Sequence, residues 1–454
     1  MSRIVLPLCL LALACSNSGK LSSVETVDDT DTTDGSDGAD VTDGSDGTDE
    51  ADASDGADGS DGDDTADSGD SGDTGSGEDP VVVLPDLTVD CEGSADFEEI
   101  QDAIEAADHG DIIAVLPCTY RERLDFLGKT LHVYGVDGPE VTILDGENTG
   151  TLVNVETGEG PGTRLAGFTL TGGYDEAAGS VIELLGSNLE IEDVIIRGNA
   201  KGMYIIQSLS GWLDITNAEI TENDVQSEGI ALLSDDGGSL TVDGMRLDCD
   251  NSTAGIYAHV ALNLDRVDIT CDEGYGIHNY HGELWMQRST VSGGLAGIYS
   301  YDTESTAEKP DYPSERNYIY NSTIYGGLIG LDVRYMDVQL INSVFWGTDA
   351  ALSMTANNTA SFARNSVFLN AACGIVGDQP FTHRFSAFYN NGADGCGITV
   401  TPAVSADPRF VSFPEDLALR SDSPLVDAGD PAAGYDDVDG SVNDIGRHGG
   451  PWGD

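Results

Sequence analysis

Aromatic rings and histidines recur at a fixed place in a glycine-based repeat. Where a glycine is followed by an inward-facing apolar residue, strand alternation turns the second and fourth residues after that glycine outward. The second positions are Tyr204, Ala231, Tyr257, His278, Tyr299 and Asp332, and the fourth are Ile206, Leu233, His259, Tyr280, Tyr301 and Arg334. Because rings stack on the apolar faces of sugars, we predict a glycan-binding groove made of Tyr257, His259, His278, Tyr280, Tyr299, Tyr301 and Arg334.

These rings also have a structural interpretation, because cross-strand aromatic pairs stabilise a sheet without any ligand. Beside them, the unusually long step between the repeat landmarks Val291 and Ile324 places a polar insertion at residues 302–317. A loop beside a ring-lined face forms a groove, in which a carboxylate or histidine could transfer protons.

The expected function is therefore non-catalytic glycan binding or adhesion, and the alternative is a carbohydrate-active enzyme, either a polysaccharide lyase or a glycoside hydrolase. A surface spacer without a ligand is a third interpretation. The sequence assigns no catalytic residue and leaves open whether the chain is an enzyme. Two carboxylates, or a carboxylate with His or Tyr, within about 5–10 Å in the groove would favour the enzyme.

A second group of polar residues lies near the carboxyl end, in the segment 435–444. It offers oxygen donors and a turn glycine that could ligate calcium: Asp436, Asp437, Asp439 and Asp444. Their spacing fits no EF-hand loop, so a capping turn is the preferred interpretation. No other cofactor is expected.

The rings must be positioned by a repeat of short β-rich segments. Landmarks such as Leu247, Ile269 and Val291 recur at intervals of about 22 residues. Two short strands per step are too little chain for a propeller blade, and the leucine-rich consensus of a horseshoe is missing. The repeat predicts a parallel β-helix of about a dozen coils, each in contact only with its neighbours.

A short amphipathic helix is expected before the repeat, where it would cap the amino-terminal end. Asp96 and Glu99 have the spacing of a capping box. Apolar residues follow at helical spacing, namely Phe97, Ile100, Ala103, Ile104 and Ala107.

The cysteines test the coil register. Cys249 and Cys271 each lie two residues after a landmark, and Cys373 and Cys396 each precede a landmark glycine. Equivalent positions in adjacent coils stack about 4.8 Å apart, within reach of a disulfide. In an exported chain we therefore predict the disulfides Cys249–Cys271 and Cys373–Cys396, which leaves Cys91–Cys118 at the amino-terminal end. Free buried thiols are the alternative.

Asparagines share another register position, at Asn321, Asn342 and Asn365. Asparagine tolerates left-handed backbone angles. We predict that their side-chain amides bond to one another along the solenoid and that their role is structural.

Several segments resemble right-handed parallel β-helix proteins of the pectin-lyase-like group. Residues 97–173 resemble the opening of such proteins in Glu99–Ile104, Gly110–Val115, Thr142–Gly146 and Gly167–Leu170. The tail is similar to the closing segment of bacterial surface members in Ala406–Phe410, Ser423–Asp430 and Asn443–Gly446. The resemblance implies an all-β, right-handed parallel β-helix solenoid with a short amino-terminal capping helix. It implies no activity, because the fold hosts lyases, hydrolases, epimerases and adhesins.

The amino terminus has the layout of an export signal. Arg3 precedes an apolar run too short to span a bilayer, and Leu11–Cys15 resembles a bacterial lipobox with Ala12 in place of the commoner leucine. We predict a signal peptide at 1–14 and lipidation of Cys15, against ordinary cleavage with Cys15 incidental. Residues 15–80 form an acidic, disordered linker with an aspartate at every third position from Asp28 to Asp73, and residues 81–454 form the β-helix domain.

The charge restricts the partners. The chain has 19 basic and 82 acidic residues, a formal net charge of −63. Nucleic acid is excluded because phosphates need a basic footprint. We expect a monomer that contacts a membrane through its lipid anchor and binds polysaccharide, located outside the cytoplasm at the bacterial outer membrane or cell surface.

Overall fold

The computed structural model describes residues 84–173, 179–200, 202–224, 228–232, 238–249, 252–302, 316–355, 360–378 and 381–453. The chain divides into two units, Met1–Gly77 and Glu78–Asp454. The predicted signal peptide, Cys15 and the acidic linker lie outside the described residues. Residues 303–315 of the predicted insertion also lie outside them.

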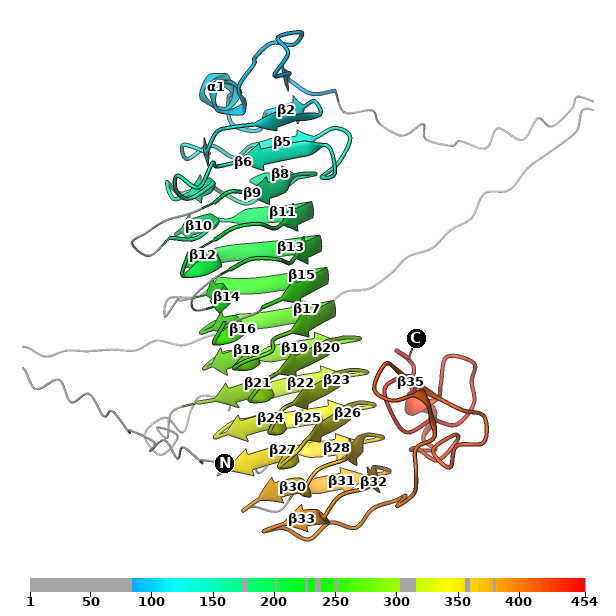
Figure 1. Cartoon of the computed structure of the whole chain (residues 1–454). Helices are drawn as coiled ribbons and strands as arrows, with labels where there is room; N and C mark the ends of the chain where they lie inside the picture. Colours follow the sequence, from blue (N-terminus) through cyan, green and yellow to red (C-terminus); the bar gives the residue numbers. More distant parts are fainter. Residues whose placement is uncertain are drawn as a thin grey trace, which may run out of the picture. The chain divides into compact units, whose positions relative to one another are not determined.

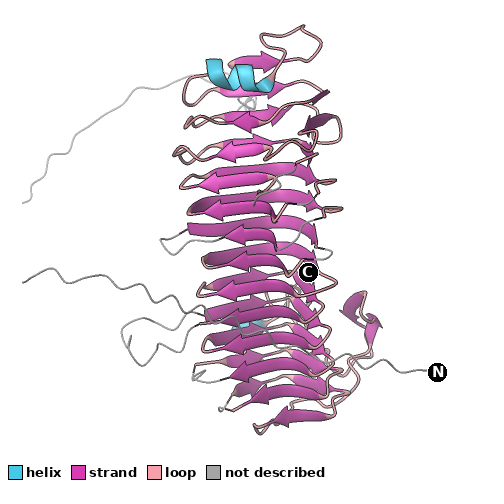
Figure 2. Cartoon of the chain, turned by 60° about the vertical axis from the view of Figure 1, so that its left-hand side comes forward, coloured by secondary structure: helices cyan, strands magenta, loops and turns pink. Residues whose placement is uncertain are grey.

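The second unit is a stack of parallel strands wound into coils (Figures 1 and 2). Within the described ranges, one sheet contains 12 strands. These are β4 (Leu124–Asp125), β7 (Val153–Val155), β10 (Ile182–Leu185), β12 (Tyr204–Leu209), β14 (Glu228–Leu232), β16 (Ala254–Ala258), β18 (Tyr275–Tyr280), β21 (Ala296–Tyr301), β24 (Ile329–Arg334), β27 (Ala350–Thr355), β30 (Cys373–Gly377) and β33 (Ala393–Cys396). Each coil contributes one strand to this sheet, so the number of coils agrees with the predicted dozen.

A larger sheet of 21 strands forms the rest of the coils that the structure describes. Its first row is β1 (Leu87–Val89), β2 (Ile112–Val115), β5 (His132–Gly135), β8 (Arg164–Ala166), β11 (Leu189–Ile196), β13 (Gly211–Ile220), β15 (Gly238–Asp248), β17 (Ala261–Thr270), β19 (Leu284–Gln287), β22 (Arg316–Tyr320), β25 (Asp337–Ile341), β28 (Phe362–Arg364) and β31 (Thr382–Arg384). Its second row adds β3 (Cys118–Tyr120), β6 (Thr142–Asp145), β9 (Thr169–Thr171), β20 (Thr290–Gly293), β23 (Thr323–Gly326), β26 (Val344–Gly347), β29 (Val367–Leu369) and β32 (Ala387–Tyr389). The long strands β11, β13, β15 and β17 pair in both rows.

Stacked aliphatic side chains form the core, as the repeat predicts. In the 12-stranded sheet the aligned inward residues are Ile206, Ile230, Ile256, Ile277, Ile298, Leu331, Leu352 and Ile375. All are fully buried, and each such burial stabilises the fold by roughly 1.5–3 kcal/mol. The chain is therefore a parallel β-helix.

The predicted register is wrong at two glycines. Ile206 aligns with Ile230, so Met203, which follows Gly202, does not point inward and is 38% exposed. Near the other end, Ile375 pairs with Gly395, which shifts the landmark Gly397 out of register. The reason is that burial of the aligned apolar side chains from Ile206 to Ile375 fixes the register of the strands. The position of the neighbouring glycine does not fix it.

Each coil bends inside the 21-stranded sheet at one residue with positive φ. The bend residues include Asp193, Asn217, Gly244, Arg266, Arg288, Asn321, Asn342 and Asn365. A serine follows the bend in the later coils, and its hydroxyl accepts a hydrogen bond from the serine amide of the coil before it, as for Ser322 to Ser343 at 3.2 Å and Ser343 to Ser366 at 3.3 Å. The continuous ladder inside the solenoid is therefore made by serines.

The asparagines mainly bind the carboxyl-terminal segment 404–453, which we call the tail. The tail contains the antiparallel strands β34 (Phe410–Ser412) and β35 (Asp416–Leu419) and the 3₁₀ turn η2 (Ala433–Tyr435). Asn321 Nδ2 donates to the carbonyls of Arg447 and Gly449 at 2.8 and 2.7 Å. The predicted amide-to-amide bond occurs between Asn365 and Asn342, at 3.4 Å. The predicted left-handed angles are confirmed at all three asparagines.

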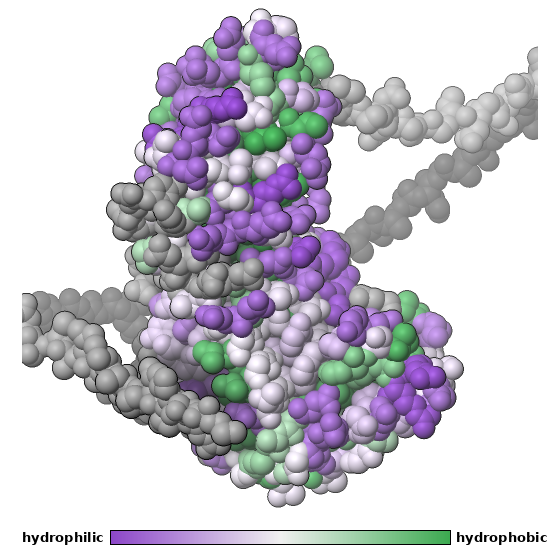
Figure 3. All heavy atoms as spheres, viewed as in Figure 1, coloured by the Kyte–Doolittle hydropathy of each residue, from purple (hydrophilic) through white to green (hydrophobic). Residues whose placement is uncertain are grey.

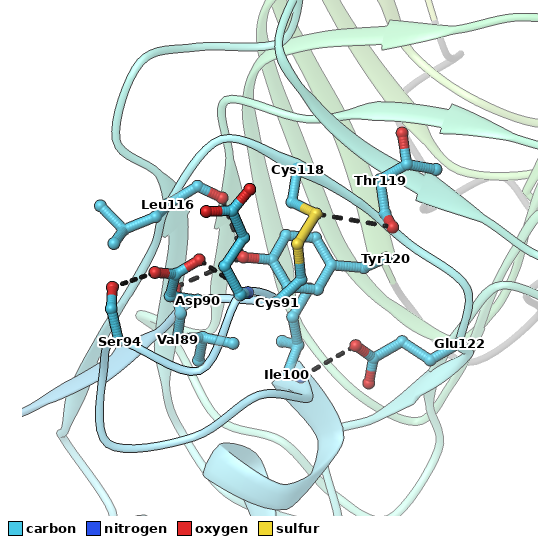
Figure 4. The surroundings of a disulfide bond; sticks show 11 residues. Val89, Asp90, Cys91, Ser94, Ile100, Leu116, Cys118, Thr119, Tyr120 and Glu122 are labelled. Atoms are coloured by element: carbon cyan, nitrogen blue, oxygen red, sulfur yellow. Dashed lines mark hydrogen bonds between the residues drawn. A yellow bond between two sulfur atoms is a disulfide. The ribbon is translucent and has the colours of Figure 1, made fainter.

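The expected short helix is present as α1 (Ile100–Ala106), with Ile100, Ala103 and Ile104 buried. The predicted capping box is wrong. Asp96 accepts hydrogen bonds from Thr88 instead, and the side chain of the N-cap residue Glu99 makes no capping hydrogen bond. Glu122, from the first coil, accepts a hydrogen bond from the amide of Ile100 at 2.9 Å (Figure 4) and another from the amide of Gln101 at 2.8 Å. A carboxylate 22 residues after Ile100 in the chain thus caps the first amides of the helix, which the local motif was expected to do.

The predicted disulfides Cys91–Cys118, Cys249–Cys271 and Cys373–Cys396 are all present. The Cα atoms of Cys249 and Cys271 are 4.7 Å apart, as expected for direct neighbours in adjacent coils. Cys396 instead pairs in the sheet with Val376, so its bond to Cys373 runs diagonally and the Cα atoms are 6.1 Å apart. Figure 4 shows Cys91–Cys118 beside the start of α1.

Candidate functional site

The predicted ring-bearing residues meet on the outer face of the 12-stranded sheet, over β16, β18, β21 and β24. In one column Tyr257 pairs with His278, His278 with Tyr299, and Tyr299 with Asp332. In the next column Tyr280 pairs with Tyr301, and Tyr301 with Arg334. We call this surface the ring face. Tyr204 does not belong to it, because Tyr204 aligns with Glu228.

The rings of this face pack against one another. The ring centroids of Tyr257 and His278 are 4.9 Å apart, those of His278 and Tyr299 are 5.1 Å apart, and those of Tyr280 and Tyr301 are 4.6 Å apart. The Tyr257 and His278 rings are edge-to-face at 73°, an arrangement that aromatic quadrupoles favour, and the other two pairs are tilted by 42° and 55°. Each ring is half-buried. The rings thus stabilise one another and still leave part of their surface to solvent.

His278 lies at the centre of the ring face. Its ring contacts those of Tyr257, Tyr275, Tyr299 and Tyr301. Burial, and secondarily the nearby His259, lowers the pKa of His278 to about 4. The imidazole is therefore neutral at neutral pH. Its Nε2 atom is buried and has no hydrogen-bond partner among the described residues.

A charged pair closes one end of the face. Arg334 Nη2 donates to the Asp332 carboxylate at 2.8 Å, and its guanidinium lies 5.0 Å from the centroid of the Tyr299 ring. The hydrogen bond to Asp332 raises the pKa of Arg334 above its ordinary value. Asp332 is buried, whereas the Arg334 side chain is 47% exposed. A permanent cation is therefore available beside the rings.

A histidine and a carboxylate meet at the edge where the insertion begins. His281 Nδ1 contacts the carboxylate of Asp302, the first residue of the predicted insertion. The ring centroids of His281 and Tyr280 are 3.9 Å apart. The contact brings a carboxylate and a histidine together, as the enzyme alternative requires. Residues 303–315, which were expected to form the wall of the groove, lie outside the described residues.

The sequence pattern missed two aromatic groups. Tyr275 joins the ring face and stacks on Tyr299 at 5.2 Å, although simple alternation from Ile277 would turn it inward. On the other sheet, Trp285 stacks on Tyr318 at 3.9 Å, and Tyr320 stacks on Trp452 at 5.9 Å. No Gly-apolar landmark precedes Trp285. It stands in the apolar run Leu284–Met286, where alternation of residue types gives no sign of which side chain faces outward.

The segment with the weak calcium prediction forms a hydrogen-bonded turn. Asp437 accepts the amides of Asp444 and Gly450, and Asp439 accepts the amide of Ser441. Burial is the largest influence that raises the pKa values of Asp437 and Asp444. In the part of the chain that the structure describes, no group of three or more His, Cys, Asp or Glu residues is arranged to hold a metal ion. The Asp437 and Asp439 carboxylates thus serve as hydrogen-bond acceptors within this turn.

Several solved structures are similar to parts of this chain. The pectate lyase Pel9A covers 77% of this chain and 90% of its own length at 13% identity and a TM-score of 0.40. The A-module of an Azotobacter vinelandii mannuronan C-5 epimerase covers 68% and 92% at 12% identity and a TM-score of 0.35. The catalytic domain of a GH87 α-1,3-glucanase covers 69% and 66% at 13% identity and a TM-score of 0.42.

No family model matches the chain, and no curated protein matches its sequence. Likenesses at these identities concern the fold alone, so the function has to be argued from side chains. Within the described ranges, no helix is long and apolar enough to cross a membrane.

Proposed function

We propose that this protein is a non-catalytic glycan-binding β-helix that works outside the cytoplasm. The observation that carries the proposal is the ring face itself, where partly exposed rings of three consecutive coils adjoin the exposed Arg334 guanidinium. Ring surfaces stack on the C–H faces of a pyranose, and a guanidinium donates to sugar hydroxyl or carboxylate oxygens. The net charge of −63 opposes a nucleic-acid partner.

Substitutions in the ring face test this function on a broad glycan array. Tyr299→Ala and Tyr280→Ala should each weaken binding about tenfold, since an aromatic stack and its buried area are lost. Tyr299→Phe keeps the ring and should retain most of the binding. Tyr325→Ala is the matched control, because Tyr325 stacks on Trp346 at 4.4 Å on the other sheet. If the alanine variants lose stability and bind every glycan as before, the rings are only structural.

A second candidate function is a carbohydrate-active enzyme, and the contact between His281 and Asp302 favours it. A carboxylate that orients an imidazole is a common arrangement for a general base. Incubation with a polysaccharide panel should then release reducing ends or unsaturated products, and Asp302→Asn should abolish the release. Binding without any release by the unmodified protein would exclude this candidate.

The proposal includes a lipid anchor at Cys15. It is supported by the lipobox-like residues Ala12–Cys15 and by disulfides compatible with an oxidising compartment outside the cytoplasm. Cys15→Ser should move the protein from the membrane fraction to the soluble fraction. A Cys15→Ser protein that still sediments with membranes would contradict the anchor.

We also propose that α1 caps the amino-terminal end of the solenoid. Its support is the pair of side chains that hold its ends: Glu122 accepts its first amides, and Lys129 Nζ donates to the carbonyls of Ile104, Glu105 and Ala107 at 2.8–2.9 Å. Lys129→Ala should speed hydrogen exchange in α1 and in the first coil together. Faster exchange in α1 alone would separate the helix from the stability of the solenoid.

A further inference from the structure

A second aromatic surface lies on the 21-stranded sheet, away from the ring face. Trp285 in β19 aligns with Asn263 in β17 on one side and with Tyr318 in β22 on the other. Its ring is nearly parallel to that of Tyr318, with an interplanar angle of 18° and a centroid distance of 3.9 Å. Tyr318 therefore covers the face of Trp285 that is turned toward β22, and the opposite face is turned toward β17.

A groove opens on that opposite side. It has a volume of about 320 Å³, and its polar lining includes Thr241, Asp243, Asn263, Asp265 and Gln287 beside the rings of Trp285 and Tyr320. Ligand pockets start at about 300 Å³. On the face in view in Figure 3, apolar residues form small separate patches among hydrophilic ones, and single exposed apolar residues need no explanation. Trp285 differs because it is 43% exposed at the wall of a groove.

The charges of the groove are compensated by the protein itself. Asp243 forms an ion pair with Arg266, and Asp265 forms one with Arg288. Asp265 and Arg288 form two charge-assisted hydrogen bonds, since both Nε and Nη2 of the arginine donate to the carboxylate. The remaining polar side chains of the lining are the neutral amides of Asn263 and Gln287 and the hydroxyls of Thr241 and Tyr320. Such a lining suits an uncharged ligand with many hydroxyl groups.

We propose that this groove binds a neutral pyranose unit of a polysaccharide, stacked on the β17-facing side of Trp285. The flat C–H face of a pyranose with equatorial hydroxyls matches an indole ring. Its hydroxyls would reach Asn263 and Gln287, which both donate and accept hydrogen bonds, and the carboxylate oxygens of Asp243 and Asp265. Because this groove and the ring face share no residue, the inference does not depend on the function proposed above.

Titration of the full-length protein with a neutral β-linked glucan hexasaccharide tests the proposal. Tryptophan fluorescence should change on binding, because a sugar stacked on Trp285 alters the environment of that indole. Trp285→Ala should weaken binding about tenfold or more, and Trp285→Phe should retain most of it. Asn263→Ala, which leaves every ring in place, should weaken it about fivefold.

Trp212→Ala is the matched control. Trp212 lies on the same sheet, is 56% exposed and does not line the groove, so its loss should leave binding unchanged. Equal losses for Trp212→Ala and Trp285→Ala would overturn the proposal, as would the absence of binding by neutral hexasaccharides or binding of polygalacturonate alone. Tyr299→Ala should leave this site intact, so a failure of the ring face and a failure of the Trp285 groove are distinguishable.

Discussion

The bend of the 21-stranded sheet has one backbone conformation and two different surroundings. Toward the amino terminus, Asp193, Asn217 and Arg266 are exposed, and a groove of about 700 Å³ runs along Asp193, Asn217 and Gly244. Toward the carboxyl terminus, Asn342 and its equivalents Asn321 and Asn365 are buried under the tail. The bend is thus exposed in the amino-terminal half and covered by the tail in the carboxyl-terminal half.

Comparing the two halves shows which residue types the bend accepts and which contacts the tail needs. The φ angle is 51–52° at Asp193, Asn217 and Arg266, and 46–51° at the three buried asparagines. The left-handed conformation alone therefore accepts aspartate, asparagine or arginine. Under the tail, Asn321 and Asn342 donate to groups of the tail and Asn365 accepts the Asp430 amide. An amide can do both, whereas a carboxylate only accepts and a guanidinium only donates.

The largest expected effect comes from removing a buried asparagine. Asn342→Ala should lower the free energy of unfolding by about 2 kcal/mol more than Asn217→Ala, because it leaves buried tail groups without partners. Asn342 Nδ2 donates to Asn443 Oδ1 and Asp444 O at 3.0 Å each. Both substitutions place alanine at a left-handed angle, so the cost of the kink cancels. Urea unfolding gives both values, and equal losses would contradict a special role for the tail.

A smaller effect is expected at the boundary between the two halves. Arg447 of the tail donates to the hydroxyls of Thr290 and Thr323 at 2.7 and 3.3 Å. Its charge also lowers the pKa of Asp268, against a larger rise caused by burial. Arg447→Ala should cost about 1 kcal/mol and raise the pKa of Asp268 further, as measured by NMR titration.

Arg246→Ala is the control for this boundary. Arg246 also lowers the pKa of Asp268 but lies in the open half. It should raise that pKa while leaving hydrogen exchange in the tail unchanged. Faster exchange in the tail of this variant would show that the two halves are coupled.

The smallest expected effect is a pH dependence confined to the tail. Burial raises the pKa values of Asp437 and Asp444 above the ordinary 3.8. An acid with a raised pKa in the folded state favours folding most when protonated, so this contribution is complete below about pH 3.8 and is lost as the pH rises through the folded value. Exchange at Ile445, corrected for its intrinsic pH dependence, should slow as the pH falls toward 4, and Asp437→Asn should weaken the trend to the part that Asp444 contributes. An unchanged trend in that variant would contradict the assignment.

The sequence predicted the solenoid because its signal repeats. The column of buried apolar residues from Ile230 to Ile375 and the disulfide Cys249–Cys271 follow from spacings that recur in each coil. The signal fails where a coil departs from its neighbours: Met203 lies beside a glycine that is out of register, and Cys396 is shifted against Cys373. Within the candidate site, alternation found Tyr257, His278 and Tyr299 but not Tyr275, whose side chain leaves the alternation at the strand start.

The sequence by itself thus determined the parallel β-helix, the disulfide pairs and the residues of the ring face other than Tyr275, because strand alternation and coil spacing are local and periodic. Only the tertiary structure decided which groups complete each feature. Glu122 rather than Asp96 caps α1, serines rather than asparagines form the inner ladder, and the groove beside Trp285 requires side chains of four coils. Contacts between segments far apart in the chain produce no repeating sequence pattern, so only the three-dimensional structure shows them.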